Sequence, residues 1–326
     1  MTTTSNPEPG AAAGQRYERM TAVAAFRLAA AHTWPAAFCP AVFGIFWCLQ
    51  RGIPLSPVQC LLLTAACILA QSSVNTLNDY VDYVGGTDSE DDNVEVNDAV
   101  LVYSHIDPKH ALRLGIGYLL AAGICGVAAA LHSGPVPYLI GLAGGCTVLA
   151  YSVSPIPVSA LPLGEVISGF VMGVLIPLGI AAVGDGKFHP EMIPECLPLF
   201  LGIALIMLSN NGSDIEKDIP AGRRTLPTVL GREASLVLYR CMLALWIGLL
   251  LIQPLICLRG AAGFPVGAVS FLLTVVLGRK PFGFLIRAKL LPRDRIRQMK
   301  SVTAANLIGN GLLAAAYAAA WLLGGM

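Results

Sequence analysis

Charged residues are scarce in this chain. Asp, Glu, Lys and Arg make up 13% of its 326 residues, whereas hydrophobic residues make up 55%. The mean hydropathy of +0.68 lies well above the range of a soluble globular domain. This composition excludes a soluble domain and predicts an integral membrane protein. A formal net charge of +1 gives no reason to expect nucleic acid or a strongly charged protein as a partner.

Paired cysteines and histidine clusters are also absent from the sequence. The nine cysteines stand singly in apolar segments, with no C-x-x-C pair and no His at ligand spacing. We therefore interpret them as small hydrophobic residues. Residues 1–20 are polar and rich in Ala, Gly and Thr, unlike a cleavable signal peptide. We expect residues 1–20 to be a disordered cytoplasmic tail and residues 21–326 to form a transmembrane domain.

Apolar segments dominate the rest of the chain, and most are long enough to cross about 30 Å of hydrocarbon. They lie near residues 23–49, 57–83, 111–131, 135–151, 163–184, 193–213, 234–257, 262–278 and 302–324. An all-α integral membrane bundle of nine transmembrane helices is therefore predicted.

The distribution of basic residues predicts how this bundle is oriented. With a cytoplasmic N-terminus, only Arg51, Lys187 and Arg259 fall on the outer side. We expect a multi-pass protein of the cell (inner or plasma) membrane, with its C-terminus outside. The basic run 279–300 is interpreted as an orientation signal and a surface for anionic lipid.

The stretch "QSSVNTLNDYVDY", residues 71–83, places polar side chains at the end of an apolar helix. At 3.6 residues per turn, one face collects Gln71, Asn75, Asn78, Asp79 and Asp82. Ionisable groups are costly against lipid, so this face is expected to line a protein interior or a water-filled cavity.

A second polar stretch, "LSNNGSDIEKD", ends the sixth segment. Asn210, Asp214 and Asp218 recur there at i, i+4 and i+8, with Asn211 beside them. Clustered carboxylates without His or Cys suit Mg²⁺, which usually shares its coordination with substrate phosphates. A magnesium diphosphate fits this chemistry. The nearby cations Lys217, Arg223 and Arg224 suit the remaining phosphate oxygens.

Two other interpretations of these stretches remain open. The polar side chains are also compatible with hydrogen bonding between helices. A cation-coupled transporter needs carboxylates too, although it typically holds them near the middle of the bilayer.

Together, "NDYVDYVGGTD", "NNGSDIEKDIPAGRRTL" and "YSVSPIPVSALPLGE" resemble the UbiA superfamily of membrane prenyltransferases. They are most similar to the branch that prenylates 1,4-dihydroxy-2-naphthoate, and the resemblance runs from about residue 23 onward. It implies nine helices around a cytoplasm-facing active-site cavity. The chain departs from the branch at Ser213, where Arg is usual, and at residues 88–98, where an acidic stretch replaces a basic one.

The resemblance implies Mg²⁺-dependent transfer of a polyprenyl chain from polyprenyl diphosphate to the naphthoate, with decarboxylation to a demethylmenaquinone. Another aromatic acceptor, such as 4-hydroxybenzoate, is the alternative. The expected metal ligands are Asn78, Asp79, Asp82, Asp88, Asp214 and Asp218, of which Asp79, Asp82, Asp214 and Asp218 are the expected catalytic residues. The expected substrate contacts are Asn75, Asn78, Asn210, Asn211, Lys217, Arg223, Arg224, Tyr80, Tyr83 and Tyr151.

Two further sets of side chains keep more than one interpretation. The three tyrosines are suited to shielding an allylic cation with their ring faces, but equally to an interfacial aromatic belt. Glu165 is a weaker candidate for the site.

Overall fold

The structure is a computed structural model, and it describes residues 17–86, 99–104, 106–154 and 157–324. Within these ranges every regular element is a helix, and one isolated β-bridge joins Glu18 to Ile106. The prediction of an all-α membrane protein is confirmed. Most of the expected N-terminal tail, residues 1–16, lies outside the described residues.

Long helices form the body of the protein. They are α2 (Pro35–Gln50), α3 (Pro57–Gly85), α5 (Pro108–Ala130), α6 (Val136–Ser152), α9 (Ile193–Ser213), α11 (Leu226–Cys257), α12 (Gly263–Arg287) and α13 (Arg295–Gly324). One more long segment consists of α7 (Gly164–Phe170), a π-helix and α8 (Ile176–Asp185). The short helices are α1 (Ala22–Leu28), α4 (Val100–Tyr103) and α10 (Ile215–Asp218). In the described part of the chain, eight helical segments are long and apolar enough to cross a membrane, and α6, at 17 residues, is shorter. The count of nine spans stays a prediction.

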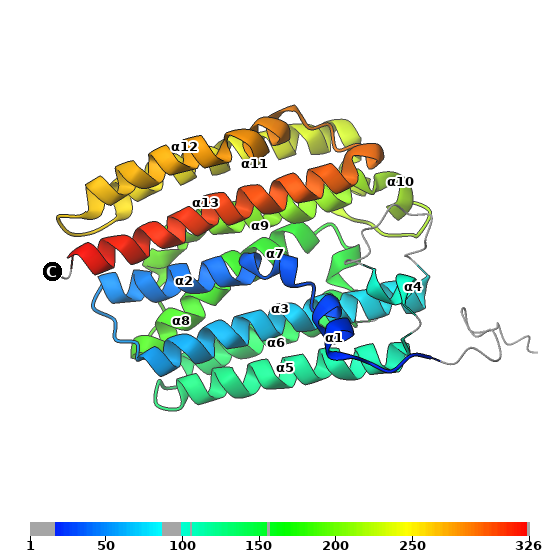
Figure 1. Cartoon of the computed structure of the whole chain (residues 1–326), viewed down its shortest axis with the longest axis horizontal. Coiled ribbons are helices and arrows are strands. Elements are labelled where there is room, and N and C mark those ends of the chain that lie inside the picture. Colours follow the sequence, from blue (N-terminus) through cyan, green and yellow to red (C-terminus); the bar gives the residue numbers. More distant parts are fainter. Residues whose placement is uncertain (1–16, 87–98, 105, 155–156, 325–326) are drawn as a thin grey trace, which may run out of the picture.

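The long helices lie side by side along the longest axis of the molecule (Figure 1). Large aromatic side chains pack between the helices, where Trp47, Trp246 and Tyr317 are fully buried. The outer faces are apolar as well, since Leu120 and Ile124 on α5 are 64% and 70% exposed. Such faces suit a lipid surrounding, because lipid tails are as apolar as the side chains that meet them.

The first apolar segment is not the single helix expected over residues 23–49. α1 ends at Leu28, Ala30 adopts a left-handed backbone with φ of 46°, and α2 begins at Pro35. Proline favours a helix start because it has no N–H to donate. The left-handed region is unfavourable for alanine. The side-chain amide of Asn75 holds this bend, donating to the Ala29 carbonyl at 3.0 Å and to Thr33 Oγ1 at 2.8 Å.

The connection between the last two helices is shorter than expected. The apolar segments 262–278 and 302–324 left residues 279–301 as the expected connection, whereas α12 continues to Arg287 and α13 begins at Arg295. Basic residues end the hydropathy signal at Gly278, but a helix continues past the hydrocarbon as long as its backbone hydrogen bonds are made. This extension brings the start of α13 close to the end of α9.

A π-helix, Val171–Leu175, separates α7 from α8 and packs against α9. Gly173 makes this approach possible. A Cβ atom added there would lie 2.4 Å from the backbone nitrogen of Phe200, and backbone atoms cannot move aside as a flexible side chain can.

We predict that Gly173→Ala destabilises the protein by about 1–3 kcal/mol, the usual cost of overpacking a core. Gly248→Ala is the matched control, since a Cβ at Gly248 in α11 meets no atom within 4 Å. Thermal unfolding of the purified variants in detergent measures the difference. Equal unfolding temperatures would contradict the close contact.

Candidate active site

The first acidic motif occupies the last turns of α3, and its side chains do not share one environment. Asn78 Oδ1 accepts a hydrogen bond from the hydroxyl of Ser152 on α6. Asp79, 7% exposed, accepts the backbone N–H groups of Val100 at 2.7 Å and Leu101 at 3.2 Å. Adjacent residues on a helix point about 100° apart, so one faces α6 and the other α4. Neighbouring side chains of the predicted polar face therefore have partners on different helices.

Asp79 therefore caps α4, because its carboxylate satisfies amides that a helix N-terminus leaves unpaired. This contact connects the end of α3 to the segment that follows residues 88–98 in the chain. Asp88 lies outside the described residues. Roles for both aspartates in metal binding stay predictions.

The three candidate tyrosines occupy two different places. Tyr80 and Tyr83 pack against a small apolar cluster formed by Leu28, Val100, Leu101, Ile106 and Ala111. Tyr151, near the end of α6, is 7% exposed and lies within electrostatic range of Asp82 and Arg223. Of the three, Tyr151 is the one that lies within electrostatic range of both a first-motif carboxylate and the loop cation Arg223.

In the second motif, Asn210 and Asp214 bind one cation from another helix. Arg295, the first residue of α13, donates from Nε to Asp214 Oδ1 at 2.7 Å and from Nη2 to Asn210 Oδ1 at 2.8 Å. The Arg295 and Asp214 side chains are 10% and 13% exposed, so this ion pair is largely shielded from water. α9 ends at Ser213, as the sixth apolar segment 193–213 predicted, and Asp214 lies between α9 and α10.

Asp218, at the end of α10, is 1% exposed and faces the loop that follows it. Its carboxylate lies 3.6 Å from Nε of Arg223 and accepts a hydrogen bond from Thr225 Oγ1 at 3.3 Å. Burial raises the pKa of Asp218, and the Arg223 guanidinium offsets part of that rise. Lys217 also lies within electrostatic range of Asp218.

The two arginines of this loop differ in position. The Arg223 side chain is partly buried and donates to the Ser159 carbonyl at 3.3 Å. Arg224 is exposed and is held by its backbone N–H, which donates to the Ala160 carbonyl at 2.9 Å. Of the two guanidinium groups, that of Arg223 lies beside a carboxylate of the motif, Asp218.

Each motif has a hydrogen-bond partner on α6 or α7: that of Asn78 is on α6 and that of Asn211 is on α7. Asn211 donates a side-chain hydrogen bond to Glu165 Oε1 at 2.8 Å, which links α9 to the start of α7. Tyr151 lies within electrostatic range of Asp82 from the first motif, of Glu165 and of Arg223. The fold thus gathers acidic, basic and hydroxyl groups from four elements at one end of the bundle.

The donors at this end are carboxylate and amide oxygens, which fit a hard divalent cation such as Mg²⁺. Within the described ranges, no three His, Cys, Asp or Glu side chains lie close enough together to hold a metal ion by themselves. Magnesium sites in proteins commonly use one or two carboxylates and complete their coordination with substrate phosphates and water. The chemistry of the donors therefore suits the expected cofactor.

Arg295 is the site residue that sequence reasoning missed, because it was counted within the basic run 279–300. A signal for it was present: Gln298, Val302 and Ala305 continue the buried face of α13 from Arg295 at helical spacing. Ser213, where an arginine was expected, is fully buried and donates to the Ser209 carbonyl at 2.8 Å. A cation thus reaches Asp214 from α13 instead of from its neighbour in the chain.

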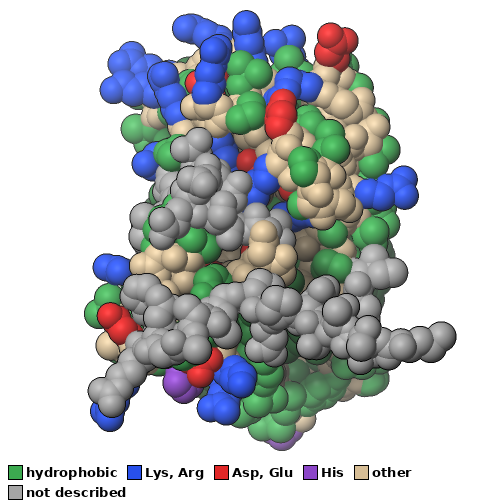
Figure 2. Space-filling view, turned by 90° about the vertical axis from the view of Figure 1, so that its right-hand side faces the viewer, with side chains coloured by type: hydrophobic (Ala, Val, Ile, Leu, Met, Phe, Trp, Pro, Cys, Tyr) green, Lys and Arg blue, Asp and Glu red, His purple; other side chains and the backbone are tan. Residues whose placement is uncertain are grey.

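The end of the bundle that carries the motifs is rich in basic side chains. Figure 2 shows Lys and Arg side chains around this end, most densely towards the edge formed by α11 and α12, with a few acidic side chains among them. An anionic substrate would meet a favourable electrostatic field here.

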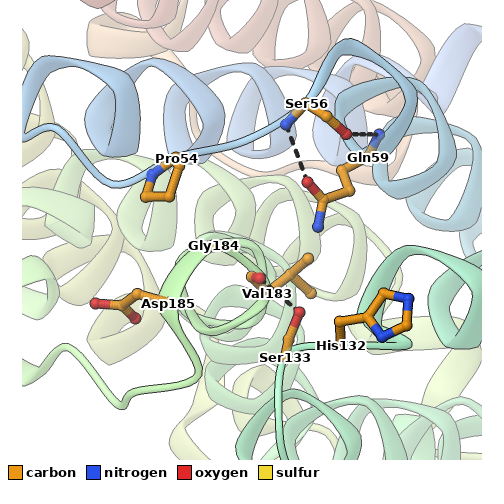
Figure 3. A pocket seen from close by; sticks show the side chains of 8 residues that line it. All are labelled: Pro54, Ser56, Gln59, His132, Ser133, Val183, Gly184 and Asp185. Atoms are coloured by element: carbon orange, nitrogen blue, oxygen red, sulfur yellow. Dashed lines mark hydrogen bonds between the residues drawn. The ribbon is translucent and has the colours of Figure 1, made fainter.

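A cavity of about 500 Å³ lies at the opposite end of α3. Its lining includes the capping pair Ser56 and Gln59, and Ser133, whose hydroxyl donates to the Val183 carbonyl (Figure 3). Asp185 is the only carboxylate in the described lining, and it bonds to His189 at 3.0 Å. No motif residue reaches this cavity, so it is not the candidate active site.

A helical membrane bundle with two acidic motifs and several cations at one end is the architecture of a membrane prenyltransferase. A model of the UbiA prenyltransferase family matches residues 37–302, and the chain belongs to this family. It is thus a prenyltransferase, and the alternative of a cation-coupled transporter is set aside.

Among curated proteins, the chain is similar to 1,4-dihydroxy-2-naphthoate octaprenyltransferase of Bacillus subtilis, with 28% identity over 213 residues, 65% of this chain and 68% of the relative. It is also similar to UbiA prenyltransferase domain-containing protein 1 of Gallus gallus, with 29% identity over 243 residues, 73% of this chain and 70% of the relative. The fold is similar to that of a UbiA homolog from Archaeoglobus fulgidus bound to GPP and Mg²⁺. That comparison gives a TM-score of 0.64 and 19% identity, covering 92% of this chain and 99% of the homolog.

We predict that Arg295→Ala destabilises the protein by about 3 kcal/mol, because it leaves the Asp214 carboxylate shielded from water without its cation. The matched control is Arg297→Ala, two residues later, where the guanidinium is exposed and lies over the Phe284 ring. Thermal unfolding in detergent compares the two variants.

A double variant isolates the ion pair. Arg295→Gln combined with Asp214→Asn should cost less than the sum of the two single variants, since each single change leaves an unmatched group. Strict additivity would argue against the pair.

Proposed function

We propose that this protein transfers a polyprenyl chain from polyprenyl diphosphate to 1,4-dihydroxy-2-naphthoate, with loss of the ring carboxylate, giving a demethylmenaquinone. The observation that supports the reaction type is that Tyr151 lies within electrostatic range of Asp82 from the first motif, of Arg223 and of Glu165, the residue to which Asn211 from the second motif donates a hydrogen bond. The acceptor is supported by the motifs quoted above and by the similarity to the Bacillus enzyme.

The diphosphate is expected to bind through Mg²⁺ at Asp82 and Asn78 from α3, and at Asp214 and Asp218 from α9 and α10. When bound, magnesium would neutralise the negative charge that develops on the leaving diphosphate. Arg223, the partly buried cation of the loop, is suited to the remaining phosphate oxygens.

The chain's own residues would then supply orientation and exclude water. Tyr151 and Asn211 are 7% and 3% exposed, and the low local dielectric strengthens each electrostatic contact to a substrate. No protein nucleophile is required, because the allylic carbon can ionise and be attacked directly by the electron-rich acceptor ring.

The basic end of the bundle supports a cytoplasmic location for the site, following the rule that positive charge stays on the cytoplasmic side. The proposal includes the cell membrane as the location, a cytoplasmic N-terminus and an outer C-terminus. A cytoplasmic site would give water-soluble aromatic acids direct access.

Competition between acceptors tests the proposal. With equal 1,4-dihydroxy-2-naphthoate and 4-hydroxybenzoate, a polyprenyl diphosphate and Mg²⁺, we expect the naphthoate to be consumed with release of carbon dioxide. Chelation of the metal should stop turnover. A prenylated hydroxybenzoate that retains its carboxylate, as the main product, would overturn the proposed acceptor and leave the family assignment standing.

Arg223 and Arg224 were both predicted to bind phosphate, but their side chains differ in burial: Arg223 is partly buried and Arg224 is exposed. Arg223→Ala should raise the apparent KM for prenyl diphosphate about tenfold or more, since a charge-assisted hydrogen bond contributes roughly 1.5–3 kcal/mol. Arg224→Ala is the matched control and should change this KM by about twofold at most, because exposed charges are screened. The same increase in both variants would refute the distinction.

A further inference from the structure

Two buried polar atoms near Asn211 and Arg223 have no hydrogen-bond partner among the described residues. Glu165 is 2% exposed; its Oε1 accepts from Asn211, and the backbone N–H groups of Glu165 and Leu226 also approach the carboxylate, but Oε2 is buried and makes no hydrogen bond of normal geometry to the residues that the structure describes. The Tyr151 hydroxyl is likewise buried, and no described residue bonds to it. The two side chains lie within electrostatic range of each other.

An unsatisfied buried polar atom costs free energy, typically about 1–3 kcal/mol, and native proteins keep few of them. Here two such atoms come from neighbouring helices, α6 and α7, and both lie within electrostatic range of Arg223. Their position next to the proposed reaction site indicates that a ligand supplies the missing hydrogen bonds.

The position of Glu165 is well defined by its surroundings. Asn211 holds one carboxylate oxygen, and the hydroxyl of Ser168 donates to the Glu165 carbonyl at 3.1 Å. The preceding Gly164 packs so closely that an added Cβ would lie 3.2 Å from the Val158 carbonyl oxygen. A side chain held in this way is preorganised for binding.

We propose that Glu165 Oε2 and the Tyr151 hydroxyl form the subsite for a ring hydroxyl of the aromatic acceptor, which rests on the proposed function for the reaction type. The ligand must donate a hydrogen bond to a carboxylate oxygen. A prenyl chain has no donor, and the diphosphate is an anion that Glu165 repels. Of the two proposed substrates, only the hydroxylated ring carries the required group.

Direct binding tests this subsite without catalysis. The probes are 4-hydroxy-2-naphthoate and 1-hydroxy-2-naphthoate, each compared with 2-naphthoate, which lacks the hydroxyl. Their fluorescence is followed on titration with purified full-length protein, without Mg²⁺ or prenyl diphosphate. We expect at least one hydroxylated probe to bind the wild type about tenfold more tightly than 2-naphthoate, as a hydrogen bond to a charged group implies.

Two near-isosteric variants assign that preference to residues. Glu165→Gln should abolish it, and Tyr151→Phe should reduce it severalfold, while the affinity for 2-naphthoate stays unchanged in both. Tyr138→Phe is the matched control on α6, since its hydroxyl bonds to the Ala130 carbonyl at 3.0 Å, far from the motifs. Unfolding temperatures verify that each variant is folded.

The outcomes separate this inference from the proposed function. The subsite is overturned if the wild type does not prefer a hydroxylated probe, and this result needs no variant. It is also overturned if either Glu165→Gln or Tyr151→Phe keeps the full preference. If the preference depends on both residues but hydroxybenzoate wins the acceptor competition, the subsite stands and the proposed naphthoate acceptor fails.

Discussion

The ion pair between Asp214 and Arg295 joins the second acidic motif to the last long helix, and much of the site depends on pairings of this kind. A carboxylate removed from water needs a cation or amide donors close by, because the unpaired charge is costly in a low dielectric. Asp79 has the amides of α4, Asp218 has Arg223, and Asp214 has Arg295. Each partner comes from a different element, so these pairings also fix where α4, the loop after α10 and the start of α13 lie.

Under the proposed function, the same carboxylates have a second use. Of the carboxylates assigned to magnesium, Asp214 and Asp218 are paired with protein cations here, so binding of the metal diphosphate would exchange partners at these two side chains. Glu165 differs from them: Oε1 is bonded to Asn211 and Oε2 makes no hydrogen bond of normal geometry in the described structure. That difference separates the acceptor subsite from the diphosphate site.

Several features of the site followed from the sequence, and others did not. The helical spacing of Asn210 and Asp214 correctly placed them on one face, where one guanidinium binds both. The same reasoning did not give the partner of Asp79, because one step along a helix turns a side chain by about 100° and a different helix then provides its partner. Hydropathy, in turn, predicted one helix over residues 23–49 and missed the bend before Pro35, where Asn75 stabilises a left-handed alanine. Hydropathy does not report such a contact, which joins residues 46 positions apart.

The sequence by itself determined that this is a helical membrane protein of the UbiA prenyltransferase family, since hydropathy over about 20 residues and short acidic motifs are local properties. Only the tertiary structure decided which partner each polar side chain has. Arg295 lies 81 positions from Asp214, and Glu165 lies 46 positions from Asn211. Pairings over such distances depend on how the helices pack, and the packing is set by the combined shape of many side chains and not by any one segment.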